Sequence, residues 1–169
     1  MRRGSKNMKK YFPLFVDLTE KDVLVVGGGT IAGRRVHTLL GFVDKITVVA
    51  PELGKRLQEL QEQGKVVWIQ DVYRKEYLVY VDMVLAATDN KDVNDQVQQD
   101  CIAVMGETGR NILFSRSDDK NQCDFFFPSI VERDGIVIGI NSGGVSPAGT
   151  KRIRREIEGL LQCESGYVE

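Results

Sequence analysis

The sequence predicts an α/β fold in which helices cover both faces of a parallel sheet. Two observations lead to this prediction. Between residues 23 and 114, short apolar runs alternate with more polar stretches that have helical spacing, as in folds with a parallel sheet. The glycine run Gly27-Gly28-Gly29 lies between the first apolar run and the first helical stretch. A chain of 169 residues has room for such a domain and a small appendage.

The expected elements follow from the spacing of apolar residues. Strands are expected at Val23–Val26, Ile46–Val49, Val66–Ile69, Met83–Ala87 and Ile112–Phe114. Helices are expected at Thr30–Leu40, Glu52–Gln63 and Asn90–Met105, the last capped by Asp89 or Asn90. Residues 73–80 are expected to be irregular or to form one or two helical turns.

The pattern changes after Ser115 and predicts a small α+β appendage. Two antiparallel strands, Phe125–Phe127 and Ile136–Ile140, are expected to be joined through an Asp134-Gly135 turn. A C-terminal helix is expected at Ser146–Leu161, with Pro147 in its first turn. We place the boundary near residues 115–118, which gives a nucleotide-binding domain at 10–115 and a second segment at 116–169.

Composition narrows the classes of function. A net charge of −1 gives no overall basic field, so nucleic acid is not expected as a partner. No apolar run approaches the roughly 20 residues that cross a bilayer, and no secretory signal is recognisable, so a cytoplasmic protein without a membrane partner is expected. Cys101, Cys123 and Cys163 lack metal-ligand spacing and a disulfide pattern, and no metal site is predicted.

The glycine run predicts a dinucleotide site. Gly27-x-Gly29-x-x-Ala32 follows a strand and begins a helix, which is the Rossmann arrangement. The first glycine permits the turn, the second lets the backbone approach a pyrophosphate, and Ala32 allows close helix packing. Together with Thr30 and Ile31, Ala32 lies in the first helical turn, where backbone amides attract phosphate.

Two other strand ends complete the predicted cofactor site. The usual acidic residue after the second strand is replaced by Ala50, so Pro51 and Glu52 are expected to contact the ribose. No arginine stands directly at this strand end, although Arg56 follows one turn later, so NAD is favoured over NADP. Thr88 and Asp89 follow the fourth strand at the edge where ligands bind, although they could also serve only as a helix cap.

Several segments together resemble a known family. They are Tyr11–Leu18, Val25–Gly29, Val48–Glu52, Ala86–Asp89, Cys123–Phe125, Phe127–Ile130 and the Ser142-Gly143-Gly144-x-Ser146-Pro147 stretch. In combination they resemble precorrin-2 dehydrogenase, which is also the amino-terminal module of siroheme synthase. The resemblance extends from about Lys10 to Leu161.

This resemblance implies a function and a catalytic residue. It implies NAD-dependent oxidation of precorrin-2 to sirohydrochlorin, a homodimer, and an acid/base aspartate after the fifth strand, which corresponds to Asp118 with Asp119 beside it. The family's Asn-Val-x-Asp run reads Ser115-Arg116-Ser117-Asp118 here, so the surroundings of the aspartate differ. Family members also continue past Leu161. Without the resemblance, Asp118 and Asp119 would be interpreted as turn residues after a strand.

Precorrin-2, the tetrapyrrole substrate that the resemblance implies, carries many carboxylates, so anion-binding groups are expected. Ser142, Gly143, Gly144 and Ser146 are predicted to present backbone amides to a carboxylate, in addition to Ser146 capping the last helix. Arg152 and Arg155, with Lys151 and Arg154 beside them, are candidates on that helix, against the alternative of a solvated basic face. His37 is interpreted as a structural or surface histidine.

Two other functions stay open. Some family members also insert ferrous iron into sirohydrochlorin, and this chain could be such a bifunctional dehydrogenase and ferrochelatase. A different class is an NAD(H)-sensing regulatory module that performs no chemistry. The Ser142–Pro147 stretch and the aspartates after the fifth strand favour an enzyme, because they belong with a substrate site.

Overall fold

The computed structural model describes residues 11–163, with the side chains of residues 162 and 163 outside the description. The predicted domain ends at residue 10 and at residues 164–169 therefore lie outside the described residues. The chain divides into two compact units. One spans Asp17–Phe127, and the other begins at Pro128 and includes the segment that ends at Val16. This division of the chain falls after Phe127, and the predicted domain boundary at 115–118 stays a prediction.

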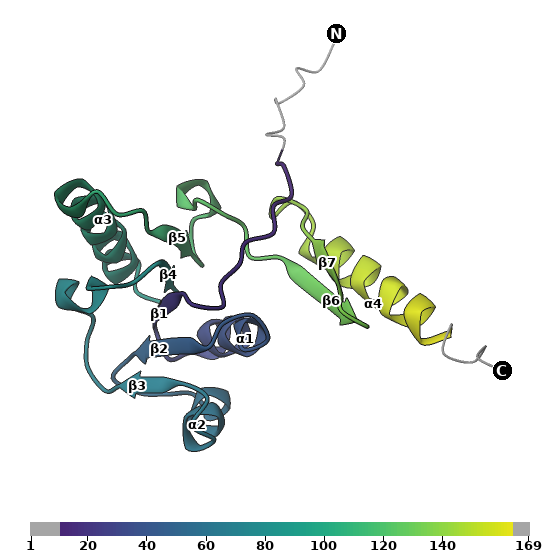
Figure 1. Cartoon of the computed structure of the whole chain (residues 1–169), viewed down its shortest axis with the longest axis horizontal. Coiled ribbons are helices and arrows are strands. Elements are labelled where there is room, and N and C mark those ends of the chain that lie inside the picture. Colours follow the sequence, from purple (N-terminus) through teal and green to yellow (C-terminus); the bar gives the residue numbers. More distant parts are fainter. Residues whose placement is uncertain (1–10, 164–169) are drawn as a thin grey trace, which may run out of the picture. The chain divides into compact units, whose positions relative to one another are not determined.

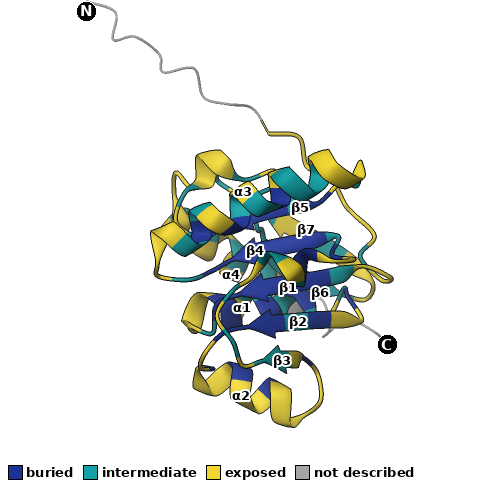
Figure 2. Ribbon diagram, turned by 90° about the vertical axis from the view of Figure 1, so that its left-hand side faces the viewer, coloured by how far each residue is buried: buried dark blue, intermediate teal, exposed yellow. Residues whose placement is uncertain are grey.

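The first unit is built on a five-stranded parallel sheet with the order β3-β2-β1-β4-β5. Its strands are β1 (Asp22–Val26), β2 (Lys45–Val49), β3 (Val67–Ile69), β4 (Met83–Ala86) and β5 (Leu113–Arg116). All five predicted strands are present, with small shifts at their ends. Figure 2 shows that burial is concentrated in β1, β2, β4 and β5, as expected for strands covered on both faces.

Helices cover the two faces of this sheet (Figure 1). Helices α1 (Thr30–Leu39) and α2 (Lys55–Glu62) pack on the face formed by residues such as Val25 and Val48. The opposite face, with Leu24 and Val84, is covered by the short 3-10 helix η1 (Lys75–Leu78) and by α3 (Lys91–Thr108). The predicted α/β architecture is therefore confirmed.

Close backbone contact fixes the turn after β1. Gly27 has φ +119°, and a Cβ there would lie 2.6 Å from the carbonyl oxygen of Ala87, at the end of β4. A Cβ on Gly28 would overlap the carbonyl oxygen of Glu52. The Gly54 amide also donates to the Gly28 carbonyl, at 2.8 Å. Glycine is required here because any side chain would push these strand ends apart.

The same contact explains why α2 begins later than predicted. Helical spacing suggested a start at Glu52, but the helix begins at Lys55, with Gly54 as its N-cap. Residues 51–54 stay outside the helix because this segment crosses Gly28, and the Gly54 amide donates to the Gly28 carbonyl. The pattern of leucines could not reveal this contact, since it comes from another strand's turn.

Helix α3 has defined ends. The Asn90 side chain accepts from the amides of Asp92 and Val93, so Asn90 is the cap, one of the two predicted candidates. Gly109, with φ +69°, ends the helix in the left-handed conformation. The helix is longer than the predicted Asn90–Met105 because the chain continues without interruption to this glycine.

The second unit contains a hairpin and a helix. Strands β6 (Ser129–Arg133) and β7 (Ile136–Ile140) pair antiparallel through Asp134 and Gly135, whose φ angles of 51° and 77° fit the predicted tight turn. Helix α4 (Pro147–Cys163) follows. The prediction of a strand at Phe125–Phe127 is wrong, because the partner of β7 is β6, which begins at Ser129; Phe125 and Phe127 pack against the core of the first unit instead.

Candidate cofactor site and the adjoining ion-pair cluster

The candidate cofactor site lies at the carboxyl ends of β1 and β4. These strands are neighbours at the centre of the sheet. From β1 the sheet continues to one side through β2, and from β4 it continues to the other side through β5. Such a reversal point is where dinucleotides bind in open parallel sheets. The turn at Gly27 lies against Ala87 here, so the glycine loop and the loop after β4 form one continuous surface.

The start of α1 is open to a ligand. Its N-cap is Gly29, and no side chain caps the helix. A Cβ built on Gly29 meets no atom within 4 Å, in contrast to Gly27 and Gly28. The first-turn residues Thr30, Ile31 and Ala32 follow directly, with Ala32 fully buried against the sheet. Open space and an uncapped helix start fit a pyrophosphate, which would accept from these backbone amides.

The segment after β2 is held by its backbone. The carbonyl oxygen of Ala50 accepts from Trp68 Nε1 at 2.9 Å, and that of Pro51 accepts from Gln70 Nε2 at 3.3 Å. Glu52 places its backbone against Gly28 while the residue itself is exposed. Pro51 and Glu52 are thus brought beside the glycine loop, as a ribose contact requires.

Asn94 organises the loop after β4. Its Oδ1 accepts from the Thr88 hydroxyl at 2.8 Å and from the Thr88 amide at 3.3 Å, and its Nδ2 donates to the Thr88 carbonyl at 3.1 Å. Asn94 is fully buried, whereas Asp89 next to Thr88 is exposed. Sequence reasoning missed Asn94, although a polar residue among the buried positions of α3 was a possible signal.

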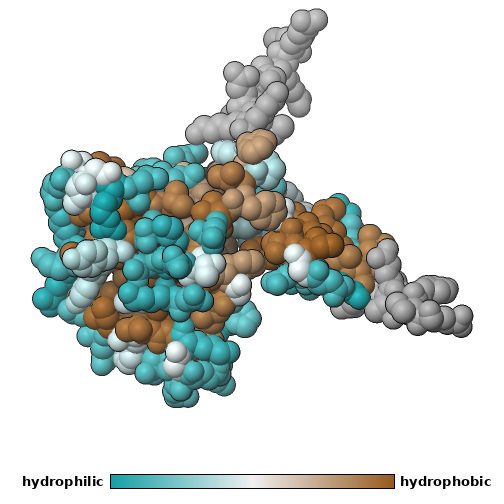
Figure 3. All heavy atoms as spheres, viewed as in Figure 1, coloured by the Kyte–Doolittle hydropathy of each residue, from teal (hydrophilic) through white to brown (hydrophobic). Residues whose placement is uncertain are grey.

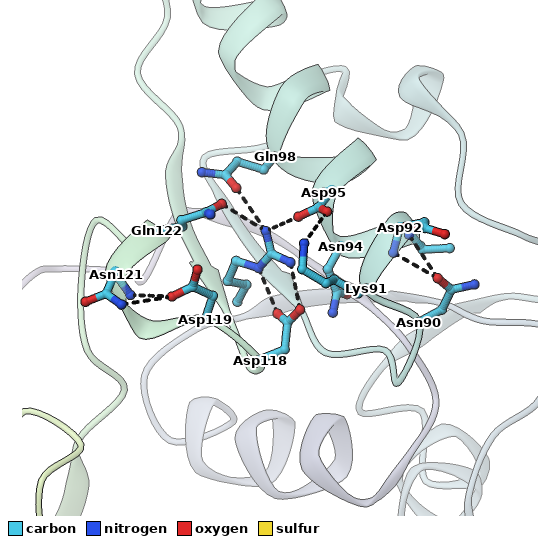
Figure 4. Close-up of polar contacts among 12 residues, drawn as sticks. Asn90, Lys91, Asp92, Asn94, Asp95, Gln98, Asp118, Asp119, Asn121 and Gln122 are labelled. Carbon is cyan, nitrogen blue, oxygen red and sulfur yellow. Dashed lines mark hydrogen bonds and ion pairs between the residues drawn. The ribbon is translucent and has the colours of Figure 1, made fainter.

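A cluster of ion pairs surrounds the buried guanidinium of Arg116 (Figure 4). Its Nε and Nη2 donate to the two carboxylate oxygens of Asp118, each at 2.7 Å. Its Nη1 donates to Asp95 at 2.6 Å, and to Gln98 and Gln122 at 3.1 Å each. Arg116 has a side-chain exposure of 0%, and no sequence pattern predicted a role for it.

The pairing fixes the ionisation of Asp118. Hydrogen bonding from Arg116 lowers the pKa of Asp118 to about 2, with a further contribution from Asn94 and against the opposing effect of burial. The same bonds raise the pKa of Arg116. Bonds from Lys91 and Arg116 lower the pKa of Asp95. Asp119 lies apart from this pairing, since its carboxylate accepts from the Asn121 amide at 2.9 Å as a cap of a short 3-10 turn.

The second unit holds the predicted substrate loop. The Ser146 hydroxyl accepts from the Gly149 amide at 3.1 Å, which confirms Ser146 as a helix cap. Gly143 and Gly144 have φ values of 61° and 71°. The Gly143 amide donates to Asn141 Oδ1 and the Ser146 amide to Ser142 Oγ, so part of the predicted amide set is already engaged inside the loop.

The loop also contacts the start of the described chain. A Cβ on Gly143 would lie 3.2 Å from the ring of Tyr11. Two segments that carry the family resemblance, Tyr11–Leu18 and Ser142–Pro147, are therefore neighbours at this point. Arg152 and Arg155 are exposed on α4, and Arg152 pairs with Glu156 at 3.1 Å.

Other classes of site find little support. His37 is exposed in the last turn of α1. Among residues 11–163, no three histidine, cysteine or acidic side chains gather to hold a metal ion. Within the same part of the chain, no helix is both long and apolar enough to span a membrane.

Comparison with known proteins agrees with this geometry. Residues 14–129 match a family model described as "Putative NAD(P)-binding". The chain belongs to this NAD(P)-binding family. The match covers the glycine loop, the segments after β2 and β4, and the Arg116 cluster. It confirms the predicted class of cofactor.

Individual relatives extend the likeness to almost the whole chain. A siroheme synthase from Mannheimia succiniciproducens is 40% identical over 94% of this chain, and one from Pseudoalteromonas translucida is 40% identical over 93%. This chain spans about one third of these relatives, 32% in each case. The solved structure "SirC, precorrin-2 dehydrogenase" is 29% identical, with a TM-score of 0.75 over 94% of this chain and 72% of its own. The resemblance and the Rossmann-like fold predicted from the sequence are confirmed.

The first prediction concerns the space above Gly29. We expect Gly29→Ala to leave the free energy of unfolding nearly unchanged, because the added methyl group meets no protein atom. We expect the same change to weaken NADH binding by about ten-fold, since a lost close contact of about 1.4 kcal/mol corresponds to that factor. Denaturant unfolding and NADH fluorescence titration measure the two effects.

Two other glycines provide matched controls. Gly28→Ala should lose folded stability, because its Cβ overlaps the Glu52 carbonyl. Gly106→Ala, in open space on α3, should be neutral or stabilising by about 0.5–1 kcal/mol with unchanged NADH binding. Unchanged NADH affinity in the Gly29→Ala variant would contradict the assignment of this surface to the cofactor.

The second prediction concerns acid stability. Because the folded-state pKa of Asp118 lies below its unfolded value, the pair stabilises the fold above about pH 4 and loses this effect as the pH falls toward 2. A shift from 3.8 to about 2 corresponds to at most about 2.5 kcal/mol, and partial exposure reduces this to about 1–2 kcal/mol. Asp118→Asn should therefore be less stable than wild type at pH 7, and the gap should narrow toward pH 2.

Glu107→Gln is the control, because it removes the carboxylate of an exposed pair with Lys75. Exposed pairs contribute little, so we expect only a small effect on unfolding. If the difference in the free energy of unfolding between wild type and Asp118→Asn stayed constant from pH 7 to pH 2, the coupling to Arg116 would be refuted.

Proposed function

We propose that this chain is an NAD-dependent dehydrogenase that oxidises precorrin-2 to sirohydrochlorin, a step toward sirohaem or cobalamin. The observation that carries the proposal is the open glycine loop, at Gly29 and the start of α1, in a chain that resembles a precorrin-2 dehydrogenase over 94% of its length. A cytoplasmic location fits this function and stays a prediction.

The residues of the first unit would hold the dinucleotide. Gly27, Gly29 and the first turn of α1 would take the pyrophosphate, while Pro51 and Glu52 lie where a ribose contact is expected. Thr88 and Asp89 border the same edge of the sheet. When bound, the nicotinamide supplies the hydride acceptor. NAD is favoured over NADP because a carboxylate, Glu52, follows the end of β2.

The reaction removes a hydride and a proton from the substrate and leaves a new double bond in its ring system. The chain must therefore bind an anionic macrocycle and exclude water from the hydride path. Ser142, Gly143, Gly144 and Ser146 form the loop proposed to contact the substrate, with Arg152 and Arg155 providing positive charge for its carboxylates. The assignment of Asp118 as the acid/base group stays a prediction.

A homodimer is also proposed, through the second unit. On the face shown in Figure 3, apolar side chains gather over β6 and β7. Ile136, Val145 and Leu160 have 65%, 72% and 69% of their surface exposed. The two-stranded β6–β7 sheet leaves edges without a neighbouring strand among the described residues. A second copy would cover such apolar surface.

The third prediction tests the reaction itself. Anaerobic protein mixed with NAD and precorrin-2 should produce NADH and the absorption spectrum of sirohydrochlorin in equal amounts. Omitting NAD should stop both signals. NADH binding without any turnover would overturn the proposal and favour a sensing module. Ferrous ion added to the sirohydrochlorin product would test metal insertion separately.

The fourth prediction concerns the arginines on α4. A charged hydrogen bond to a substrate carboxylate contributes about 1.5–3 kcal/mol, so Arg152→Gln and Arg155→Gln should each raise the KM for precorrin-2 by about ten-fold or more. The Kd for NADH should not change. Arg133→Gln, in the same unit with the same loss of charge, should leave the KM for precorrin-2 unchanged and serves as the control. An unaltered KM in both α4 variants would remove these arginines from the substrate site.

A further inference from the structure

The surroundings of Asp118 differ from those of a proton acceptor. Both of its carboxylate oxygens accept from the guanidinium of Arg116, in a two-point pair with distances of 2.7 Å and 2.7 Å. This pairing is the geometry in which arginine binds a carboxylate most strongly. Arg116 comes two residues before Asp118, where the family run Asn-Val-x-Asp has a valine.

The pair cannot easily exchange protons. Arg116 is buried and permanently charged, so its counter-charges have to remain in place. Protonating Asp118 would leave this buried cation with Asp95 as its remaining anionic partner in the cluster. A general base works best with a pKa near the working pH. Arg116 instead holds the pKa of Asp118 at about 2.

The cluster connects to the cofactor surface at two points, through Asn94 and through the Ser117 amide. The Asn94 side chain helps to lower the pKa of Asp118, and its Nδ2 donates to the Thr88 carbonyl at 3.1 Å. Thr88 follows Ala87, whose carbonyl lies against Gly27. The Ser117 amide donates to the Ala86 carbonyl at 2.9 Å, which fixes the start of the Asp118 segment to the end of β4. The ion pair therefore braces the loop that borders the dinucleotide.

We propose that Arg116 and Asp118 form a positioning pair for the cofactor loop, and that Asp118 is the counter-ion of Arg116 rather than the acceptor of the substrate proton. This rests on the proposed dehydrogenation. In that reaction the substrate's hydride passes to the nicotinamide, its proton passes to water, and the electron pair of the second bond forms the new double bond. Asp118 stays ionised throughout.

A double-mutant cycle tests the inference through cofactor binding. NADH affinity is measured by fluorescence in wild type, Arg116→Gln, Asp118→Asn and the double variant. Each single change leaves a charge without its partner and should weaken NADH binding on the order of ten-fold, whereas the double variant should recover most of the loss. Arg116→Lys keeps the charge without the two-point geometry, and provides a milder variant if Arg116→Gln fails to fold.

The exposed pair between Lys75 and Glu107 is the matched control. It joins η1 to the far end of α3, and its atoms are 2.9 Å apart. Lys75→Gln, Glu107→Gln and their combination should leave NADH affinity unchanged. Additive losses in the Arg116–Asp118 cycle, with no recovery in the double variant, would overturn the positioning role.

Turnover of precorrin-2 separates positioning from proton transfer. At saturating NAD, the double variant should keep a kcat within about ten-fold of wild type, whereas loss of a general base costs about 10²–10⁴-fold. In the Arg116→Lys variant, kcat/KM should fall at acidic pH. Adding Asp118→Asn to this variant should remove that fall. A double variant as inactive as Asp118→Asn, with normal NADH affinity, would refute the inference. If the wild-type protein did not convert precorrin-2, the proposed function would be refuted. The double-mutant cycle on NADH affinity would still test the positioning role.

Discussion

The close approach of three strand ends at Gly27 and Gly28 is the constraint on which the first unit depends. The end of β4 lies against Gly27, and the segment after β2 crosses Gly28. Without side chains at these two positions, three loops converge on one edge of the sheet. The start of α1 is then left open beside them. This packing thus creates the surface that is proposed to bind the cofactor.

The neighbouring Arg116 cluster extends this arrangement across the sheet edge. It ties β5 and the segment after it to α3 through Asp118, Asp95 and the two glutamines, Gln98 and Gln122. A buried cation is costly unless its hydrogen bonds are satisfied, and here all three nitrogens have acceptors. The cost of breaking any one bond makes the cluster rigid. Rigidity next to Thr88 suits a loop that is proposed to hold a large, flexible dinucleotide in one orientation.

The two units contribute different parts of the proposed enzyme. The first provides a cofactor surface made largely of backbone, which suits a ligand shared by many proteins. The second provides an exposed apolar hairpin, a glycine turn and a basic helix, which suit a partner subunit and a polyanionic substrate. Such a division lets the substrate site change while the nucleotide surface stays the same.

The sequence by itself determined the five strands, the class of cofactor, the Ser146 cap and the Asp134-Gly135 turn. These features depend on local patterns, namely apolar periodicity, glycine conformations and side chains that bond to nearby amides. Only the tertiary structure decided the start of α2, the packing of Phe125 and Phe127, and the roles of Asn94 and Arg116. Those depend on atoms that are far apart in the chain: Gly28 with Glu52, Asn94 with Asp118, and Arg116 with Asp95. Asp118 shows the difference most clearly, since the sequence identified the residue but only the folded chain revealed that a buried arginine holds its charge.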